Sequence, residues 1–399
     1  MFRKTLACTA FLLMNWPAFH EIARAADAPT SPATAAGDYL VYVGSYTNPA
    51  PSTSSASKGI YGFRFDSKTA AMTPLGLVAE TANPAHVWPS PSGRFLYAVN
   101  WQVGDKVNGD SVSAFAVDQK TGGLTFLNKV SSHGESPNQV VLDPAGKVAI
   151  TVTFKGGTVT ALPIEPDGHL GEAFYTDQHV APASTDPKPP TPRVHGVVFS
   201  KDGQFAYVAD LGLDRIYSYE VDVATRKMKP CDPAFVQVKS GSGPRRLQLQ
   251  PNGKFLYVNM ESTSTVSAFE VNGGALKEIQ SISTLPADFQ GSNTTAEIQM
   301  DRTGRFLYVS NRGHDSIAMY EADPVQGTLK MIETVPSLGK TPRNLRIDPT
   351  NHYLFVANQG GENVVVFRID QTTGHLTPAN VQVPVAQAGG VAVIKAQAP

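Results

Sequence analysis

The sequence contains an internal repeat, and four residues at corresponding ends of its strands could do chemistry: the imidazole of His195, the carboxylate of Glu261 and the guanidinium groups of Arg245 and Arg312. A positioned histidine or glutamate can activate water as a general base, which typically accelerates a reaction by about 10²- to 10⁴-fold. Guanidinium groups bind carboxylates in a two-pronged way and stabilise a developing oxyanion. Together these groups predict hydrolysis of a cyclic ester, with either His195 or Glu261 as the base. Loop charges that only pair with one another are the structural alternative.

The repeat that carries these residues occurs seven times, at intervals of 56, 53, 57, 50, 51 and 47 residues. Each copy contains a turn, an aromatic and β-branched strand such as GKFLYVNM, a third strand such as TVSAFEV and a short fourth strand. The copies begin at Gly37, Gly93, Gly146, Gly203, Gly253, Gly304 and Asn351. A period of about 50 residues indicates an array of identical units. The sequence therefore predicts an all-β, seven-bladed β-propeller with four antiparallel strands per blade.

The two ends of the repeat predict how the ring closes. The first copy lacks a leading strand of its own, whereas the chain ends with a spare one, GGVAVIK, from Gly389. Pairing that strand into the first blade would hide two sheet edges. We therefore expect the propeller to span residues 37–396, with its ring closed by the C-terminal strand joining the first blade.

Columns of the aligned repeats predict which side chains reach the mouth of the central channel. The innermost strand begins about eight residues before the turn, and the second strand ends about eight residues after it. Because the two strands are antiparallel, both positions lie at one rim. We expect His195, Glu261, Arg245 and Arg312 to be catalytic. Substrate-binding residues are expected at the same rim, namely His86, Arg246, Glu297, Arg343 and Gln359.

The segment before the repeat has a different composition. Arg3 and Lys4 are followed by an apolar run that is too short and too interrupted to span a membrane, and then by Ala-Arg-Ala at 23–25. This pattern predicts a secretory signal peptide over residues 1–25 and a disordered leader over residues 26–36. We expect a periplasmic or secreted protein, with no membrane segment after cleavage.

Charge and composition argue against other classes of partner. The formal net charge is −1, and no basic run is present, so a nucleic-acid partner is not expected. No spacing typical of a catalytic zinc site is visible, so we expect no metal. Cys231, the one cysteine beyond the predicted signal, is expected to be a packed side chain. The expected partner is a small-molecule lactone, bound by a monomer.

Longer stretches around these positions, including VGSYT, GPRRLQLQPNGKFLYV and SNRGHDSI, carry a family resemblance. The chain is similar to the seven-bladed lactonase family, which includes propeller-type 6-phosphogluconolactonases and fungal carboxymuconate cyclases. The resemblance implies a lactone-handling site without metal or organic cofactor, in which a histidine, two arginines and a glutamate bind and turn over the substrate. The matching positions are His195 in PRVHG, Arg245 in GPRR, Glu261 in NMES and Arg312 in SNRG.

The resulting hypothesis is a secreted lactonase, similar to 6-phosphogluconolactonase, that hydrolyses a sugar or aldonic acid lactone. A signal peptide argues against the phosphorylated lactone itself, because that metabolite is cytosolic. Departures from the family pattern, such as Arg246 where histidine is usual, lie on the substrate side. Two alternatives stay open: a carboxymuconate-type lactonising cycloisomerase, and a non-catalytic ligand-binding propeller.

Overall fold

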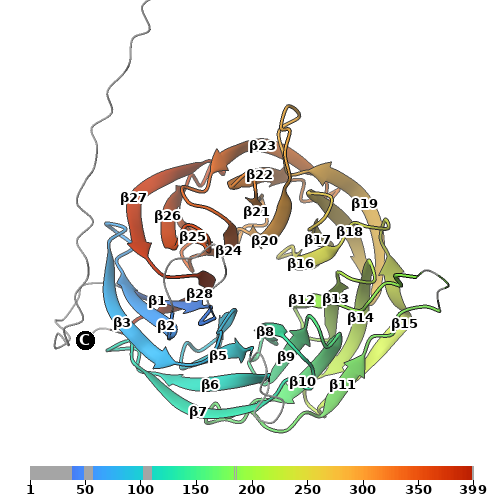
Figure 1. Ribbon diagram of the computed structural model, residues 1–399, viewed down its shortest axis with the longest axis horizontal. Coiled ribbons are helices and arrows are strands. Elements are labelled where there is room, and N and C mark those ends of the chain that lie inside the picture. The colour runs from blue at the N-terminus through green and yellow to red at the C-terminus, as the bar shows by residue number, and fades with distance from the viewer. Residues whose placement is uncertain (1–37, 49–56, 102–109, 184, 186, 398–399) are drawn as a thin grey trace, which may run out of the picture. The chain divides into compact units, whose positions relative to one another are not determined.

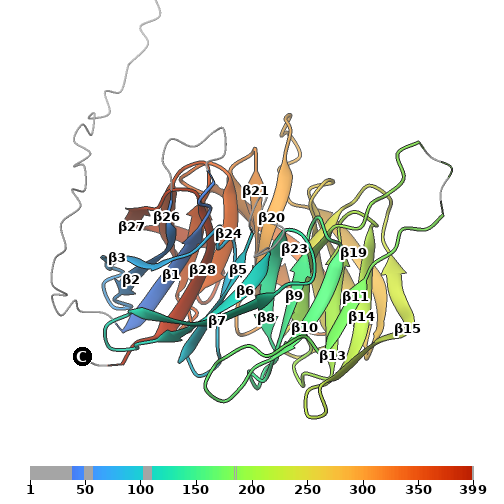
Figure 2. The ribbon, with the colours of Figure 1, turned by 60° about the horizontal axis from the view of Figure 1, so that its bottom comes forward.

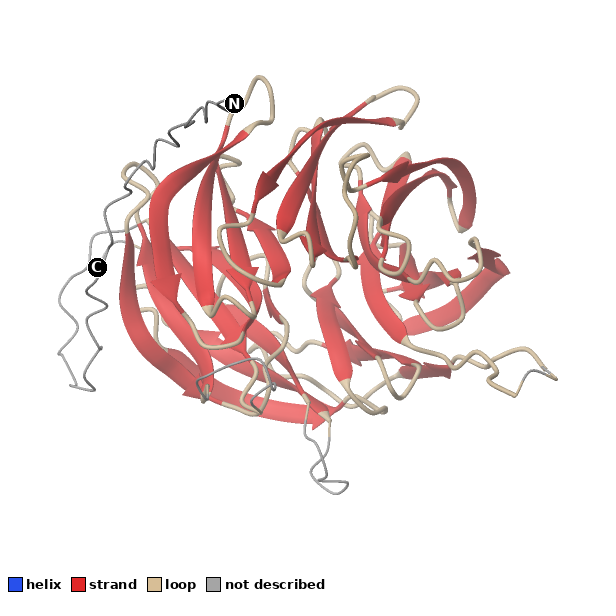
Figure 3. Ribbon diagram, turned by 45° about the horizontal axis from the view of Figure 1, so that its top comes forward, coloured by secondary structure: helices blue, strands red, loops and turns tan. Residues whose placement is uncertain are grey.

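A computed structural model of the chain describes residues 38–48, 57–101, 110–183, 185 and 187–397. The predicted signal peptide (1–25) and leader (26–36) lie outside these residues. The described residues belong to one compact unit, Thr34–Pro399. Their regular structure consists of strands, as Figure 3 shows. No helix in this part of the chain is long and apolar enough to cross a membrane.

Seven four-stranded antiparallel sheets surround a central axis, and we number these blades 1 to 7 in chain order (Figure 1). Starting with blade 1, the innermost strands are β28 (Ala388–Lys395), β4 (Val87–Pro89), β8 (Pro137–Leu142), β12 (Val194–Phe199), β16 (Pro244–Leu249), β20 (Thr294–Met300) and β24 (Pro342–Ile347). The second strands are β1 (Tyr39–Ser45), β5 (Phe95–Asn100), β9 (Val148–Thr153), β13 (Phe205–Asp210), β17 (Phe255–Met260), β21 (Phe306–Arg312) and β25 (Tyr353–Asn358).

The two outer strands of each blade complete the sheets. The third strands are β2 (Gly59–Phe65), β6 (Ser111–Val117), β10 (Thr158–Pro163), β14 (Arg215–Asp222), β18 (Thr265–Asn272), β22 (Ser316–Ala322) and β26 (Asn363–Ile369). The outermost strands are β3 (Met72–Glu80), β7 (Leu124–Ser131), β11 (Tyr175–Gln178), β15 (Lys227–Gln237), β19 (Ala275–Ser283), β23 (Leu329–Pro336) and β27 (Leu376–Pro384). The predicted seven-bladed β-propeller is confirmed.

Blade 1 is assembled from both ends of the chain. Figure 2 shows β28 beside β1, and the sheet order is β28-β1-β2-β3. The pairing runs along the whole of β1, from Tyr39 opposite Lys395 to Ser45 opposite Ala388. The C-terminal strand therefore closes the ring, as the sequence predicted, and β1 has a neighbour on both sides.

The apolar core is divided into layers between neighbouring blades. In β17, Tyr257 packs in one layer with Val309 of blade 6, whereas Leu256 packs in another with Ala209 of blade 4. Successive side chains of a strand point to opposite faces, so the second strand of each blade is buried on both sides. This double burial explains the unbroken apolar runs of the repeat. Each fully buried leucine stabilises the fold by roughly 1.5–3 kcal/mol.

Tyrosine hydroxyls of the second strands join several blades to the next blade. Each donates a hydrogen bond to a glycine carbonyl in a hairpin turn of the following blade. The pairs are Tyr42 with Gly122 (3.0 Å), Tyr97 with Gly168 (3.1 Å), Tyr207 with Gly273 (2.6 Å) and Tyr308 with Gly374 (2.9 Å). Gly168 has a φ of 90°, and a Cβ there would lie 2.3 Å from the ring of Phe95. Only glycine therefore fits this turn.

Candidate active site

A β-bulge occurs near the start of the innermost strand in several blades. In β12 the register shifts between Val194 and Gly196, so that His195 is the extra residue. The equivalent extra residues in β8, β16 and β24 are Asn138, Arg245 and Arg343. A bulge turns a side chain away from the regular alternation of the strand. As a result, the side chains at this repeat position in four blades all point toward the mouth of the central channel.

These bulge residues meet at a cavity of about 260 Å³ at the mouth of the channel. Its lining consists of Tyr46, Ala85, Trp101, Ser136, Pro137, Asn138, Phe154, Lys155, His195, Arg245, Glu261, Arg312 and Arg343. The structure thus brings the four residues predicted to be catalytic into one cavity. Arg343, predicted to bind substrate, lines it as well. The volume lies just below the usual range of pockets for drug-sized ligands, about 300–1,000 Å³, and suits a small ring compound.

Glu261, which directly follows β17, is held between two arginines. Its Oε2 accepts a hydrogen bond from Nε of Arg245 at 2.6 Å, and its Oε1 lies 3.1 Å from Nη2 of Arg312. The two arginines are themselves tied to blade 6, because Arg245 donates to the carbonyl of Ala296 and Arg312 to that of Thr295. One carboxylate therefore fixes two guanidinium groups beside the cavity.

The charge state of Glu261 follows from these contacts. Burial raises the pKa of Glu261, but the charges of Arg245 and Arg312 outweigh that effect and lower the pKa below its usual value. Both carboxylate oxygens are engaged by guanidinium groups, so neither is left to take a proton from water. Its place in the site is to neutralise and orient the arginines.

His195 has the opposite environment. The side chain is buried, its Nδ1 is enclosed without a hydrogen-bond partner among the described residues, and the ring of Phe154 packs edge-on at 5.7 Å. Burial lowers the pKa of His195 well below its usual value, and the surrounding arginines, Arg245 first, lower it further. The imidazole is therefore neutral at neutral pH, and no hydrogen bond from another described residue occupies its Nδ1.

One wall of the cavity is aromatic. Tyr46 and Trp101 pack edge to face at 6.3 Å, Arg343 lies over Tyr46 at 5.1 Å, and Lys155 lies over Trp101 at 5.7 Å. Sequence reasoning did not assign these aromatic residues to the site. The signal was present for Trp101 and also for Phe154, because both occupy the repeat column that contains Glu261.

Four residues predicted to bind substrate lie outside the cavity lining. His86, Arg246 and Glu297 are buried, each 4–5% exposed, at the next position along their innermost segments. Strand alternation turns this position away from the cavity. Gln359 follows β25 and donates its backbone N–H to the carbonyl of Thr341. Of the predicted binding residues, the structure therefore places only Arg343 at the cavity.

A layer of side chains lies between the cavity and the opposite end of the channel. Its buried members are His86, Gln139, Arg246, Glu297 and Asn344. A second cavity, of about 420 Å³, lies among the turns at the far ends of the innermost strands and shares no lining residue with the first. The layer is therefore the floor of the candidate site.

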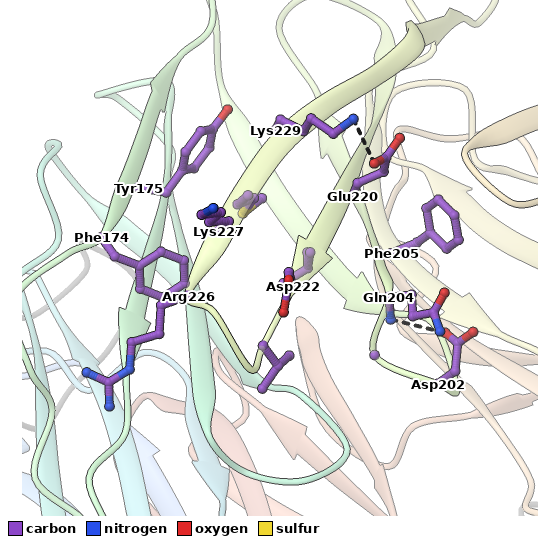
Figure 4. Close-up of a pocket in the computed structure, with 14 residues that line it drawn as sticks. Phe174, Tyr175, Asp202, Gln204, Phe205, Glu220, Asp222, Arg226, Lys227 and Lys229 are labelled. Atoms are coloured by element: carbon purple, nitrogen blue, oxygen red, sulfur yellow. Dashed lines mark hydrogen bonds and ion pairs between the residues drawn. The ribbon is translucent and has the colours of Figure 1, made fainter.

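A larger cavity lies elsewhere, at the junction of blades 3 and 4, and has a volume of about 780 Å³ (Figure 4). It contains no histidine, and its charged groups are partly paired with one another, as in the 2.8 Å contact between Lys229 and Glu220. None of the predicted site residues lines it. The chemistry predicted from the sequence therefore belongs to the mouth cavity.

Among the described residues, no group of three or more histidine, cysteine, aspartate or glutamate side chains lies close enough to hold a metal ion. The mouth cavity is lined by three arginines, a lysine and one glutamate, together with the neutral imidazole of His195. Cationic donors suit an anionic or hydroxyl-rich ligand.

Comparison with known proteins shows the family to which the chain belongs. Residues 40–393 match the model of the family described as "Lactonase, 7-bladed beta-propeller". The 6-phosphogluconolactonase of Bacillus subtilis is 33% identical over 87% of this chain and 96% of its own length. The solved structure of the periplasmic gluconolactonase of Pseudomonas aeruginosa is 30% identical, with a TM-score of 0.81 over 90% of this chain and 99% of that one. The chain therefore belongs to the seven-bladed β-propeller lactonase family.

Proposed function

We propose that the protein hydrolyses a sugar or aldonic acid lactone in the mouth cavity, with His195 as the general base. The observation that carries this assignment is the contrast between the two candidate bases. Glu261 is engaged by two arginines, whereas His195 is neutral and has no side-chain hydrogen bond among the described residues. Family membership and the lactonase relatives support the class of reaction.

The proposed reaction begins when His195 takes a proton from a water molecule whose oxygen attacks the lactone carbonyl carbon. The carbonyl oxygen becomes an oxyanion, which the guanidinium groups of the cavity stabilise. The tetrahedral intermediate then collapses and breaks the ring C–O bond. The imidazolium returns its proton to the ring oxygen, which leaves as a hydroxyl group. The product is a hydroxy acid, which loses its carboxyl proton to solvent at neutral pH.

Two arginines have donors left for the substrate. Arg312 contacts Glu261 and Thr295 through Nη2, which leaves its Nη1 without a hydrogen bond to the described residues. Arg343 forms no ion pair with any carboxylate among them. We assign Arg312, with Arg245, to the developing oxyanion and Arg343 to a hydroxyl or anionic group of the substrate. The aromatic wall of Tyr46 and Trp101 would pack against the apolar face of a sugar ring.

The test is acid release from a panel of neutral, carboxylated and phosphorylated lactones at fixed pH. His195→Asn should reduce kcat by about 10²- to 10⁴-fold on the preferred lactone, because it removes the base. His375→Ala is the matched control, since His375 is exposed and pairs with Glu333 far from the mouth cavity. Full activity of a folded His195→Asn variant would refute the assignment of the base.

The same panel separates the alternatives. Formation of a lactone from an unsaturated dicarboxylate, without hydrolysis of any lactone tested, would assign the cavity to a cycloisomerase. Tight binding of a lactone without turnover would assign it to a ligand-binding propeller.

We also propose that the protein is exported and works in the periplasm or outside the cell. The support is the signal-like pattern of residues 1–25 and the similarity to a relative described as periplasmic. Expression of the full chain followed by cell fractionation and N-terminal sequencing tests this proposal. A mature protein that still begins at Met1 and stays in the cytoplasm would contradict it.

A further inference from the structure

Arg246 does not line the mouth cavity, but it contacts two residues that do. The side chain belongs to β16 and is 5% exposed. Its Nη1 donates a hydrogen bond to the carbonyl oxygen of His195 at 2.8 Å, and its Nη2 donates one to the carbonyl oxygen of Asn138 at 3.1 Å. Both acceptors are the extra residues of bulges in other blades. One guanidinium group therefore fixes the backbone of blades 3 and 4 where they open into the cavity.

Arg246 is held in turn from the neighbouring blade 6. Oε2 of Glu297 lies 3.7 Å from Nε of Arg246 and accepts a hydrogen bond from Nδ2 of Asn344 at 2.7 Å. Oδ1 of Asn344 accepts a hydrogen bond from the backbone N–H of Val391 at 3.0 Å. These contacts form a continuous chain from blade 3 to blade 1. The guanidinium group is thus fixed beneath the cavity and faces backbone carbonyls instead of a ligand.

Arg246 also acts on the imidazole of His195 through space. Burial is the largest cause that lowers the pKa of His195, and four positive charges follow in the order Arg245, Arg246, Arg343 and Arg312. The other charged side chains at the same cavity are Glu261 and Lys155. A lowered pKa keeps the imidazole neutral at neutral pH, so activity that depends on it is lost only as pH falls through that lowered value.

We propose that Arg246 is a positioning residue, which holds His195 and Asn138 in register from beneath the cavity and does not touch the substrate. The inference rests on the proposed lactone hydrolysis and replaces the expectation that Arg246 binds substrate. Loss of Arg246 should therefore change kcat and the pH profile, whereas KM should change little.

The test uses two single variants and one double variant. In Arg246→Met, kcat should fall by about 10- to 100-fold, because a small misplacement of a catalytic group has an effect of this size. KM should stay within about twofold, and the acid limb of kcat/KM should move up toward the ordinary histidine value of about 6.5. Arg246→Lys keeps the charge but not the two-pronged contact, so its acid limb should stay in place while kcat remains low. The double variant Arg246→Met/Glu297→Gln removes both charges of the pair if the single variant misfolds.

Arg346→Met is the matched control. Arg346 is another arginine of an innermost strand, packed over Trp88 at 4.5 Å, and it is not among the groups that shift the pKa of His195. This variant should leave kcat and the acid limb unchanged. A shift as large as that of Arg246→Met would show that any change of charge in the channel moves the profile, and would overturn the specific role.

An NMR titration of the His195 imidazole, assigned by its absence in His195→Asn, needs no substrate and separates the two proposals. In Arg246→Met the imidazole pKa should rise, and an unchanged value would overturn the positioning role. A rise in KM with an unmoved acid limb would show substrate binding by Arg246 and would also overturn it. If the wild type hydrolyses no lactone but the titration shifts as expected, the proposed function fails and the control of His195 by Arg246 stands.

Discussion

Positive charge is concentrated around one carboxylate at the mouth of the propeller. Three arginines and a lysine line the cavity, whereas Glu261 is its only acidic residue among those described. Such an excess attracts anions and favours states in which negative charge develops. Like charges this close are tolerated because Glu261 bridges two of them. The single carboxylate thus organises the cations that the proposed reaction needs.

We predict that Glu261→Gln will impair both stability and turnover. The amide keeps the shape of the side chain but leaves Arg245, which is 1% exposed, without its counter-charge. The loss in free energy of unfolding should be about 3 kcal/mol, the low end for a broken buried ion pair, because the Glu261 side chain is 24% exposed. Because both arginines lose their orientation, kcat should fall by about 10²-fold. Denaturant titration and steady-state kinetics check both values, and wild-type kcat in this variant would contradict the role of Glu261.

At the scale of the elements, the tyrosine hydroxyls connect blades that otherwise meet through apolar side chains. We predict that Tyr97→Phe will lower the free energy of unfolding by about 1 kcal/mol, because it leaves the carbonyl of Gly168 without this donor. The denaturant midpoint should fall while the slope of the transition stays the same.

Tyr257→Phe provides the control at the same repeat position. Its hydroxyl is buried but has no hydrogen-bond partner among the described residues, so its removal should be neutral or slightly stabilising. Equal losses in the two variants would mean that ring packing, and not the bond to the next blade, sets the effect.

The repeated elements explain what could be predicted from the sequence. The seven sequence repeats predicted the number of blades, and the missing first strand and spare last strand predicted how the ring closes. Both features follow from periodicity and strand count, which are visible in the residues themselves. The bulges were not visible, since the extra residue of a bulge looks like any other residue of a strand. Residues such as His195 and Arg246 were therefore expected at the same rim, although the first lines the cavity and the second lies beneath it. The catalytic roles themselves stay predictions until the variants are measured.

At the scale of the whole molecule, the ring depends on a strand supplied by the end of the chain. We predict that deletion of residues 388–399 will abolish cooperative folding, because β28 is the innermost strand of blade 1 and its removal exposes the edge of β1. Deletion of residues 396–399 leaves β28 intact and should shift Tm by only a few degrees. Calorimetry and gel filtration of the two truncated proteins check this, and a native-like melting transition in the longer deletion would refute it.

A layer of buried side chains lies beneath the mouth cavity, and the cavity at the far end of the channel shares no lining residue with it. We therefore expect substrate and product to use the same opening. The hydroxy acid formed in the proposed reaction would then leave by the route through which the lactone entered, past Tyr46 and Trp101. Two molecules cannot pass in a space of about 260 Å³. Accumulated acid should therefore compete with fresh lactone for the same cavity, and we expect product inhibition of the competitive type.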